Sequence, residues 1–479
     1  MTNSGTTRRG VIGALAGAAA VTALPAESAA AGTKPAGTTA AGTKAAGTKE
    51  TPFRARPGSS KRPNILFILA DDLGWADLSS YGSPEIRTPN LDRLARSGVR
   101  FTQGYSAGAV CSPTRVALYT GRLPGRTPGG LPEPIGSVNE RDGIPSTHPT
   151  LASLLKKAGY ATALIGKWHG GFLPHFSPLR TGWDYFFGNY SGGVDYYSKY
   201  SHTGRYDLFE GETEIPNDGR YYTDVIADKA EDWITTAKKQ AKPWLLNLNF
   251  TSPHWPWEAP GDRRVSEEIT AQIKAGNTQA IFHNDGGSLE TYTKMVENLD
   301  ARIGQVLNAL RRSGQEENTL VVFASDNGGE RFSYNWPLTG TKGSLSEGGI
   351  RVPTILRWPA RIRSGQVSHE PVVTHDWTAT LLEIAGAAPS PDHPLDGASF
   401  AGYLLRGADA PERDIFWRTR ANRALRRGKW KYLRLSTSDA LYDVEADPRE
   451  QANLAAKHPE IVAELRATWE QINAGLLSY

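Results

Sequence analysis

Short apolar runs alternate with longer amphipathic stretches along the chain from Lys61 onward. The short runs are unbroken and rich in Ile, Leu, Val and Phe, which predicts strands buried on both faces, whereas apolar residues spaced three and four apart predict helices. The predicted strands are 64–70, 160–166, 244–250 and 319–325, and the predicted helices are 88–98, 150–159, 221–240 and 292–314. This order is typical of an α/β fold with a large, mainly parallel sheet sandwiched by helices.

The pattern changes beyond about residue 390. Strand-like segments are found at 414–420, 422–435 and 440–444. They are followed by an amphipathic helix that is predicted to begin at Pro459. We therefore expect a main domain over residues 61–390 and a smaller C-terminal antiparallel sheet plus helix, an α+β subdomain, over residues 391–479. Asp396, near this boundary, is expected to shape a turn.

The first 60 residues have another composition. Two arginines at 8–9 precede an apolar run at 11–24 and then small residues, which is the pattern of a twin-arginine export signal, although an ordinary export signal is the alternative. The run is too short to span a bilayer, so no stable membrane insertion is expected. We expect a signal peptide over 1–31 that engages the export machinery, a disordered low-complexity linker over 32–60, and a secreted or periplasmic protein.

Net charge argues against a nucleic-acid partner. The 479 residues have a formal net charge of +4, but residues 1–60 hold seven Lys or Arg against two Glu. Residues 61–479 therefore carry a net charge of −1. On net charge alone, the folded part is not expected to bind polyanions.

Polar residues follow each of the four main predicted strands. They are Asp71 and Asp72, Lys167 and His169, His254, and Asp326 and Asn327. Because the C-terminal ends of parallel strands share one edge of a sheet, and ligands bind in the crevice there, these side chains are expected to converge. Each of them alone is also typical of an ordinary loop.

The residues after the first and fourth strands offer only oxygen ligands. Asp71, Asp72, Asp326 and Asn327 therefore suit a hard cation such as Ca²⁺ or Mg²⁺ and do not suit zinc. The alternative is that these residues only cap helices or turns. Their pairing at two strand ends favours the metal site.

The only cysteine of the chain, Cys111, lies in the sequence CSPTR. Pro113 suits the first turn of a helix, Ser112 is the candidate cap and Gly121 the candidate stop, so Cys111 is predicted at a helix N-terminus. Backbone N–H groups at such a terminus attract anions. Arg115 lies one turn further along the same face, where it can hold both the cysteine-derived group and an anionic, tetrahedral ligand.

Two other interpretations of this cysteine exist. Cysteine phosphatases place five residues between their cysteine and arginine, whereas three separate Cys111 from Arg115. A buried free cysteine that behaves as a small hydrophobe would be the default if CSPTR stood alone.

Several blocks accompany that motif. Cys111-Ser112-Pro113-Thr114-Arg115 matches the C-x-P-x-R signature of type I, formylglycine-dependent sulfatases, and GYATALIGKWH contains their G-K-W-H block. Further similar blocks, in the same order, are NILFILADDLGWADLSSYG, TPNLDRLARSGVRFTQGYS, YTGRLPG, SPHWPW, SDNGG, LTGTKGSLSEGGIRVPTILRWP and LYDVEADPREQANLA. The chain from about residue 62 thus resembles sulfatases of the arylsulfatase and N-acetylgalactosamine-sulfatase type. The resemblance implies the alkaline-phosphatase-like fold and makes residues 61–390 the catalytic domain.

The resemblance implies a chemistry that residue spacing alone does not show. In this family the signature cysteine is oxidised to Cα-formylglycine by a formylglycine-generating enzyme, so Cys111 would supply the nucleophile and also contact the Ca²⁺. Arg115 would hold that group, and Lys167 and Lys342 would bind the sulfate oxygens. His169 would accept the proton that collapses the sulfated intermediate, and His254 would protonate the departing alcohol.

The implied activity is the hydrolysis of sulfate esters, releasing sulfate from a sulfated carbohydrate or an aryl sulfate. Two alternatives stay open: a phosphonate or phosphate monoester hydrolase on the same fold, and an inactive protein that binds sulfated glycans. The aromatic segment 181–202 is a candidate for stacking on a sugar ring. Asp195 and His202 are candidates for contacts to sugar hydroxyls, and Ser191 is a weak candidate for a further sulfate contact.

Overall fold

The structure is a computed structural model that describes residues 61–479. The predictions of a signal peptide over 1–31 and a linker over 32–60 concern residues outside this range. Within residues 61–479, no helix is both long enough and apolar enough to cross a membrane.

One large mixed sheet organises the main domain. Its order is β11-β2-β10-β9-β1-β8-β4-β5-β6-β7. The strands are β11 (Gln366–Ser368), β2 (Val99–Phe101), β10 (Thr354–Arg357), β9 (Thr319–Ser325), β1 (Asn64–Ala70), β8 (Trp244–Asn249), β4 (Ala161–Gly166), β5 (Tyr185–Gly188), β6 (Phe209–Glu210) and β7 (Thr213–Glu214). The central pairs from β9 to β5 are parallel, so β1, β4, β8 and β9 end at the same edge of the sheet.

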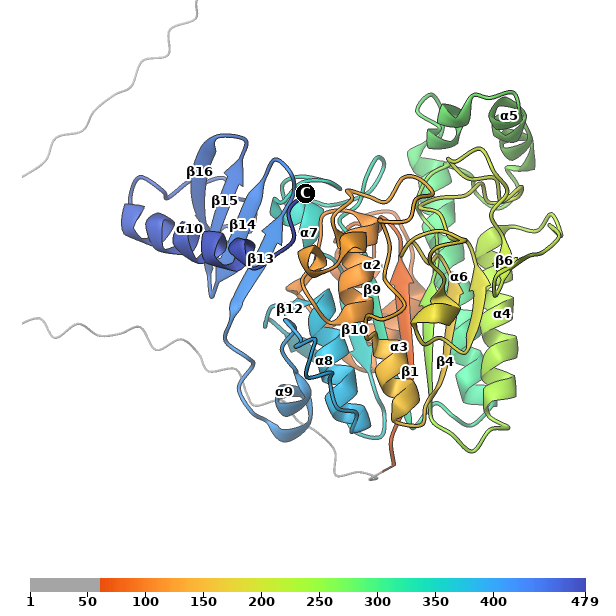
Figure 1. The fold of residues 1–479 in the computed structure, drawn as a ribbon, viewed down its shortest axis with the longest axis horizontal. Helices are drawn as coiled ribbons and strands as arrows, with labels where there is room; N and C mark the ends of the chain where they lie inside the picture. Colours follow the sequence, from red (N-terminus) through yellow and green to blue (C-terminus); the bar gives the residue numbers. More distant parts are fainter. Residues whose placement is uncertain (1–60) are drawn as a thin grey trace, which may run out of the picture. The chain divides into compact units, whose positions relative to one another are not determined.

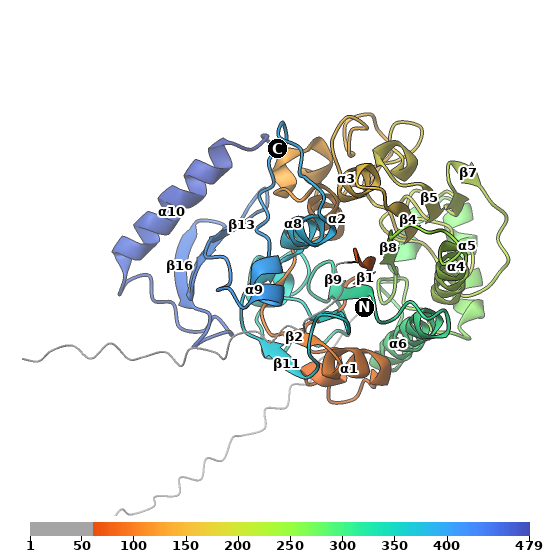
Figure 2. The ribbon, with the colours of Figure 1, turned by 90° about the horizontal axis from the view of Figure 1, so that it is seen from below.

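Helices cover both faces of this sheet (Figure 1). On one face lie α1 (Pro89–Arg96), α4 (Tyr222–Ala237) and α6 (Leu289–Arg312), and on the other lie α2 (Cys111–Thr120), α3 (Leu151–Lys157), α8 (Thr374–Ala385) and α9 (Ala401–Arg406). Figure 2 shows α2, α3 and α8 on one side of the central strands and α1 and α6 on the other. Two further helices, α5 (Arg263–Lys274) and the single-turn α7 (Glu347–Ile350), lie in the connections.

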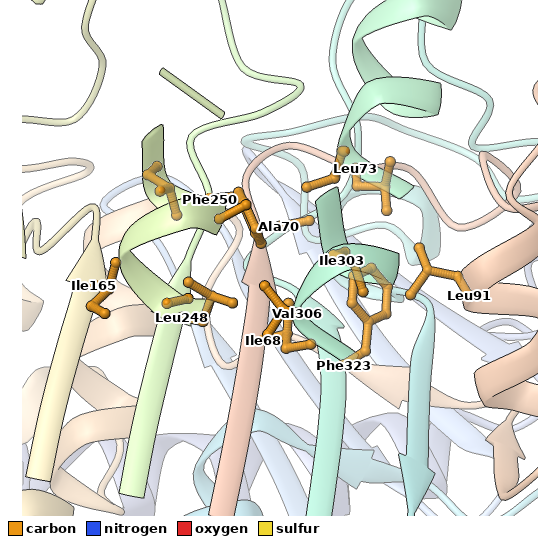
Figure 3. Close-up of a cluster of buried hydrophobic side chains, with 14 of the residues drawn as sticks. Ile68, Ala70, Leu73, Leu91, Ile165, Leu248, Phe250, Ile303, Val306 and Phe323 are labelled. Carbon is orange, nitrogen blue, oxygen red and sulfur yellow. The ribbon is translucent and has the colours of Figure 1, made fainter. Parts of the chain in front are cut away.

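Strand β1 shows why its apolar run is unbroken. Leu66, Ile68 and Ala70 pack into the core that contains α1, α4 and α6, a part of which is drawn in Figure 3. The alternate residues of the strand, beginning with Ile65 and Phe67, pack into the core under α2, α3 and α8. Because successive side chains of a strand point to opposite faces, a strand covered on both faces must be apolar throughout.

A four-stranded antiparallel sheet forms the C-terminal part. Its strands are β13 (Asp414–Arg418), β14 (Arg423–Arg427), β15 (Trp430–Leu435) and β16 (Ser438–Asp443), and α10 (Pro459–Ala474) packs on them. Trp417 of β13 donates a hydrogen bond from Nε1 to the Ser106 carbonyl at 2.8 Å. That contact lies beside the small pair β3 (Gly104–Tyr105) and β12 (Val372–Val373), where both parts share apolar residues.

The predicted fold class is confirmed, because the structure has the large mainly parallel sheet, the helices on both faces and the small C-terminal sheet with its helix. Two details differ. The segment 422–435, expected as one strand-like stretch, forms the hairpin β14–β15, and Gly428 takes a positive φ of 54° between them. Helix α6 begins at Leu289, earlier than predicted, because the Ser288 side chain accepts a hydrogen bond from the Thr291 N–H.

Candidate active site

Helix α2 places Cys111 in its first turn, as predicted. Every residue of this helix is buried, and Gly121 ends it in the left-handed conformation with φ 68°. The prediction that Ser112 caps the helix is wrong: the preceding Val110 occupies the cap position without a side-chain bond. The Ser112 hydroxyl instead accepts a hydrogen bond from the Ile135 N–H at 2.9 Å, so it holds the 131–137 segment against the helix.

The carboxylates and the amide that follow β1 and β9 meet as predicted. Asp72 takes a left-handed backbone conformation with φ 62°. Its N–H donates to Asp326 Oδ1 at 3.2 Å, and its own Oδ1 accepts from Asn327 Nδ2 at 2.7 Å. Left-handed non-glycine residues carry a conformational cost and concentrate at functional sites.

This cluster has oxygen atoms available for a cation. Asp71 Oδ1 and Asn327 Oδ1 are buried and accept no hydrogen bond. Within residues 61–479, one ligand atom from each of Asp71, Asp72, Cys111 and His254 falls in a group whose members lie within 4.8 Å of one another. The carboxylate and amide oxygens of Asp71, Asp72 and Asn327 fit a hard divalent cation. Asp326 is outside that group; its Oδ1 accepts from the Asp72 N–H and its Oδ2 from Arg115 Nε at 3.0 Å.

Three cationic side chains converge on the same cluster. Lys167 Nζ donates to Asp71 Oδ2 at 2.5 Å, and Lys342 Nζ donates to Asp72 Oδ2 at 2.7 Å. Arg115 lies 2.8 Å from Asp326 Oδ2 through Nη2 and donates from Nη1 to the Lys167 carbonyl at 3.2 Å. Its guanidinium is fully buried, so Arg115 fixes the positions of the Asp326 carboxylate and of the Lys167 backbone.

Two histidines complete the site. His169 has φ 52°, and its Nε2 lies 2.9 Å from the Ile135 carbonyl, which requires this nitrogen to carry the proton. Its Nδ1 is buried without a partner. His254 likewise presents Nδ1 to the Trp255 carbonyl at 2.8 Å, which leaves its Nε2 3.6 Å from Asp72 Oδ2.

Two consecutive glycines allow the backbone to approach both imidazole rings. A Cβ at Gly192 would lie 2.6 Å from His169 Cε1, and one at Gly193 would lie 2.8 Å from His254 Cε1. Any larger residue would have to displace the rings, so these glycines help to set the ring positions.

Burial controls the protonation of these groups. It raises the pKa of the Cys111 thiol and, together with the neighbouring Asp326, raises the pKa of Asp71. It lowers the pKa of both histidines, and positive charge from Lys342 lowers that of His254 further. Both rings are therefore neutral near pH 7 when no anion is bound.

The weaker candidates from the sequence have other roles or surroundings. Asp195 is fully buried, and its Oδ1 accepts hydrogen bonds from the Tyr197 and Ser198 N–H groups, which gives it a structural role in the turn that follows; its contact to a sugar stays a prediction. Ser191 is also fully buried, and its hydroxyl donates to the Gly193 carbonyl at 3.2 Å.

The two remaining residues of interest lie closer to the surface. His202 lies near enough to His169 for their charges to interact, and its Nε2 is 3.1 Å from the Gly136 carbonyl. Asp396 forms an ion pair with Arg126 at 2.8 Å and accepts from the Leu123 N–H, which agrees with a structural role.

Sequence reasoning missed two neighbours of the site, Glu330 and Asn249. Glu330 accepts from Lys342 Nζ at 3.3 Å. Asn249 donates to the Lys167 carbonyl at 2.8 Å and to the Tyr119 hydroxyl at 2.9 Å. A signal for Asn249 did exist, because it is a polar residue at the end of a strand whose other residues are mostly apolar.

Comparison with known proteins shows which family the chain that carries this site belongs to. The family described as Sulfatase matches residues 63–387, more than half of the chain. The chain belongs to the sulfatase family. A second family, described as N-sulphoglucosamine sulphohydrolase, C-terminal, matches residues 341–474. The protein is therefore an enzyme that hydrolyses sulfate esters, as the sequence blocks implied.

Relatives of this sulfatase agree over most of its length. It is 32% identical to N-acetylgalactosamine-6-sulfatase of Rattus norvegicus over 402 residues, covering 78% of the chain and 72% of that relative. It is 30% identical to arylsulfatase J of Mus musculus, covering 88% and 78%. Among solved structures, Ps i-CgsB in complex with k-i-k-neocarrahexaose is 30% identical with a TM-score of 0.75, covering 86% of this chain and 92% of that one. These matches confirm the predicted family and fold.

Proposed function

We propose that this sulfatase removes sulfate from a sulfated carbohydrate, using a formylglycine at position 111 and a Ca²⁺ ion held by Asp71, Asp72, Asp326 and Asn327. One observation carries the proposal: the single cysteine lies in the first turn of α2, beside a carboxylate cluster and three cations. Such an arrangement suits a tetrahedral anion whose charge increases during the reaction.

The oxygen donors of the cluster fit the cation. Asp71 Oδ1 and Asn327 Oδ1 are buried acceptors that receive no hydrogen bond from any residue in the range 61–479. When bound, a divalent ion supplies Lewis acidity toward the sulfate and lowers the pKa of the hydroxyl that attacks it. A formylglycine at position 111, as its hydrate, would supply that hydroxyl and a second one from which a base could take the proton that allows sulfate to leave and the aldehyde to re-form.

The cationic side chains bind and orient the substrate. Lys167 and Lys342 point their ammonium groups at the two adjacent carboxylates, Asp71 and Asp72. They are therefore close to any sulfate bound there and would share their remaining donors with its oxygens. Arg115 donates hydrogen bonds to Asp326 and to the Lys167 carbonyl, and so fixes the Asp326 carboxylate and the Lys167 backbone relative to each other.

The two histidines differ in the nitrogen that exchanges a proton. His169 donates from Nε2 to the Ile135 carbonyl, so its unpartnered Nδ1 is the atom that accepts a proton. His254 donates from Nδ1 to the Trp255 carbonyl, so its Nε2 must gain a proton before giving it to the leaving oxygen. The negative charge of a bound sulfate ester favours that protonated ring.

The ring of Trp255 supports a carbohydrate substrate. It is half-buried beside His254, with the ring centroids 4.0 Å apart, and Lys342 Nζ lies 5.9 Å from its centroid. An aromatic face at this distance from the proton donor can stack on the sugar that carries the sulfate. The names of the relatives, N-acetylgalactosamine-6-sulfatase and a protein bound to neocarrahexaose, agree with this class.

Modification by a formylglycine-generating enzyme, export by the twin-arginine route and an extracytoplasmic location complete the proposal. The export prediction depends on residues 1–31, and the boundary near residue 390 stays a prediction. Both follow from the sequence patterns described above.

Mass spectrometry and paired substrates test this function. The full chain is produced with a formylglycine-generating enzyme, the peptide that spans Cys111 is weighed, and turnover of an aryl sulfate is compared with that of the matched aryl phosphate. We expect an aldehyde at position 111 and faster turnover of the aryl sulfate than of the aryl phosphate. The variant Cys111→Ala should have neither the aldehyde nor the aryl sulfate turnover. An unmodified thiol in an active enzyme would refute the nucleophile, and dominant phosphate turnover would favour the phosphohydrolase alternative.

A further inference from the structure

A groove of about 350 Å³ on the C-terminal part has an unusual concentration of positive charge. It lies among the β13–β14 turn, the end of β15 and the C-terminal end of α10. Its charged and aromatic lining consists of Arg418, Arg420, Arg423, Arg434, Trp469 and Tyr479. The net charge of residues 61–479 is −1 and does not reveal this groove. A sum over the whole surface cannot show a local cluster of positive charge.

Aromatic rings hold three of the guanidinium groups. Arg418 and Arg420 lie over the Tyr479 ring, at 4.7 and 5.0 Å from its centroid, and Arg423 lies 4.7 Å from the Trp469 centroid. Stacking restrains a long side chain while leaving its edge N–H donors free for an anion. The arginines of the groove are therefore ordered before any ligand binds.

The charge of the groove is only partly neutralised. Within residues 61–479, neither Arg418 nor Arg420 forms an ion pair, although Glu133 lies close enough to Arg418 for their charges to interact. The Arg418 donors reach Asn473 Oδ1 and the Leu477 carbonyl. Arg423 is 3.7 Å from Glu470. The remaining carboxylates are Asp439, which lies 3.6 Å from Arg434 and 3.2 Å from Arg466, and Glu133, which accepts from the Arg420 backbone N–H at 3.0 Å.

The groove adjoins the active site. Glu133, which contacts Arg420, is two residues from Ile135, whose carbonyl contacts His169, and two residues span at most about 7 Å. A narrow cavity beside the groove is lined by Thr419 and Tyr479 and also by Val110, the residue before Cys111. Figures 1 and 2 both place the C-terminal end of the chain beside α2.

We propose that this arginine groove binds sulfate groups of the same glycan chain whose neighbouring sulfate is hydrolysed, so that the preferred substrate is a multiply sulfated oligosaccharide. The inference rests on the proposed function. A guanidinium presents paired donors that match two oxygens of a tetrahedral anion, which makes arginine better suited than lysine to this task. A monosulfated aryl ester occupies only the active site and does not reach the groove.

The test is inhibition of aryl sulfate turnover by hexasaccharides prepared from carrageenan, chondroitin sulfate and heparin. The groove variant is Arg420→Gln/Arg423→Gln. It retains the hydrogen bond from the backbone N–H of position 420 to Glu133. It also leaves Arg418 unchanged, because Arg418 donates to the Leu477 carbonyl near the end of the chain. The control Arg312→Gln/Arg406→Gln removes the same charge from exposed arginines of α6 and α9. Each protein is the full chain carrying the modified residue 111.

We expect the groove variant to raise the inhibition constant of the tightest hexasaccharide about tenfold, which corresponds to about 1.4 kcal/mol, while KM for the aryl sulfate stays within about twofold. The control should behave as the parent enzyme does, and inhibition of the parent should weaken with added salt. The groove proposal is overturned if no hexasaccharide inhibits, or if the inhibition constant is the same for the groove variant and the control. If the parent enzyme releases sulfate neither from aryl sulfate nor from any of the hexasaccharides, the proposed function fails, and calorimetric titration with the hexasaccharides still decides on the groove.

Discussion

Lys431 of β15 lies at the centre of a buried ion network between the two sheets. Its Nζ is 2.9 Å from Glu347 Oε1 and 2.8 Å from Glu450 Oε1, and all three side chains are at most 2% exposed. Glu450 Oε2 accepts from the Glu347 N–H at 2.8 Å, and the Tyr105 hydroxyl donates to Glu347 Oε2 at 2.6 Å. Replacing Lys431 by Met keeps the volume but leaves two buried carboxylates without their shared ammonium.

The cost of that substitution can be estimated. Removing one partner of a buried ion pair destabilises a protein by about 3–5 kcal/mol. We expect the lower end, because burial already raises the pKa of Glu450 and this carboxyl can take up a proton. An unfolding entropy of about 2.1 cal/mol/K per residue gives roughly 0.9 kcal/mol/K for residues 61–479, so Tm should fall by roughly 3–4 °C.

Activity should fall as well, because Glu347 follows the loop that carries Lys342. In that loop the Gly343 N–H donates to the Ala109 carbonyl at 2.8 Å, two residues before Cys111. The Gly349 carbonyl accepts from Gly328 at 2.9 Å, next to Asn327. We expect Lys431→Met to lower kcat/KM for an aryl sulfate about tenfold, since small displacements in a preorganised site are costly.

Thermal unfolding and steady-state kinetics measure both effects. Lys429→Met is the matched control, because the same change is made two residues away on a side chain that is 49% exposed. Lys431→Arg, which keeps the charge, should recover part of the activity. If Lys431→Met matched Lys429→Met in Tm and in kcat/KM, the network would have no role in holding the Lys342 loop.

Four further outcomes are expected. Arg115→Ala should lower kcat by at least roughly 10²-fold, as the loss of one preorganised group does, and an unchanged kcat would contradict its positioning role. His254→Gln should lower kcat by about 10²-fold or more for sugar sulfates and much less for an aryl sulfate with an acidic leaving group; equal losses on both substrates would count against a proton donor. A chelator should abolish turnover and added Ca²⁺ should restore it, whereas an enzyme indifferent to the chelator would have no essential metal. Burial alone would raise the Glu347 pKa, but the positive charges of Lys431, Arg351 and Arg426 outweigh burial and hold this pKa at about 2, below the ordinary 4.5. The stability that ionised Glu347 contributes is therefore full above about pH 4.5 and is lost as the pH falls toward 2. The Tm difference between the parent and Glu347→Gln should accordingly shrink between pH 5 and pH 3.

Local sequence was sufficient for the strands that carry the site. An unbroken apolar run such as 64–70 can be stable only with both faces covered, which predicts the sandwiched parallel sheet. Parallel strands end at one edge, so Asp71, Lys167 and Asp326 were expected to meet, and they do: Lys167 contacts Asp71, and Arg115 contacts both Asp71 and Asp326. The position of Cys111 in a first helical turn likewise follows from Pro113 and Gly121, because both act within a few residues.

Side-chain partners that are distant in the chain were decided only by the tertiary structure. The candidate cap Ser112 bonds to Ile135 instead, and Asp195 lies in the core although its neighbours suggested a sugar contact. No repeating pattern in the sequence predicts the Lys431 network or the arginine groove, because each arises where loops from different strands come together. The spacing of apolar residues along the sequence indicates which face of a helix or strand is buried. The direction and the partner of a polar side chain depend on three-dimensional packing. The sequence therefore determined the scaffold and the reacting groups, and the packing decided how those groups are held and where additional charge collects.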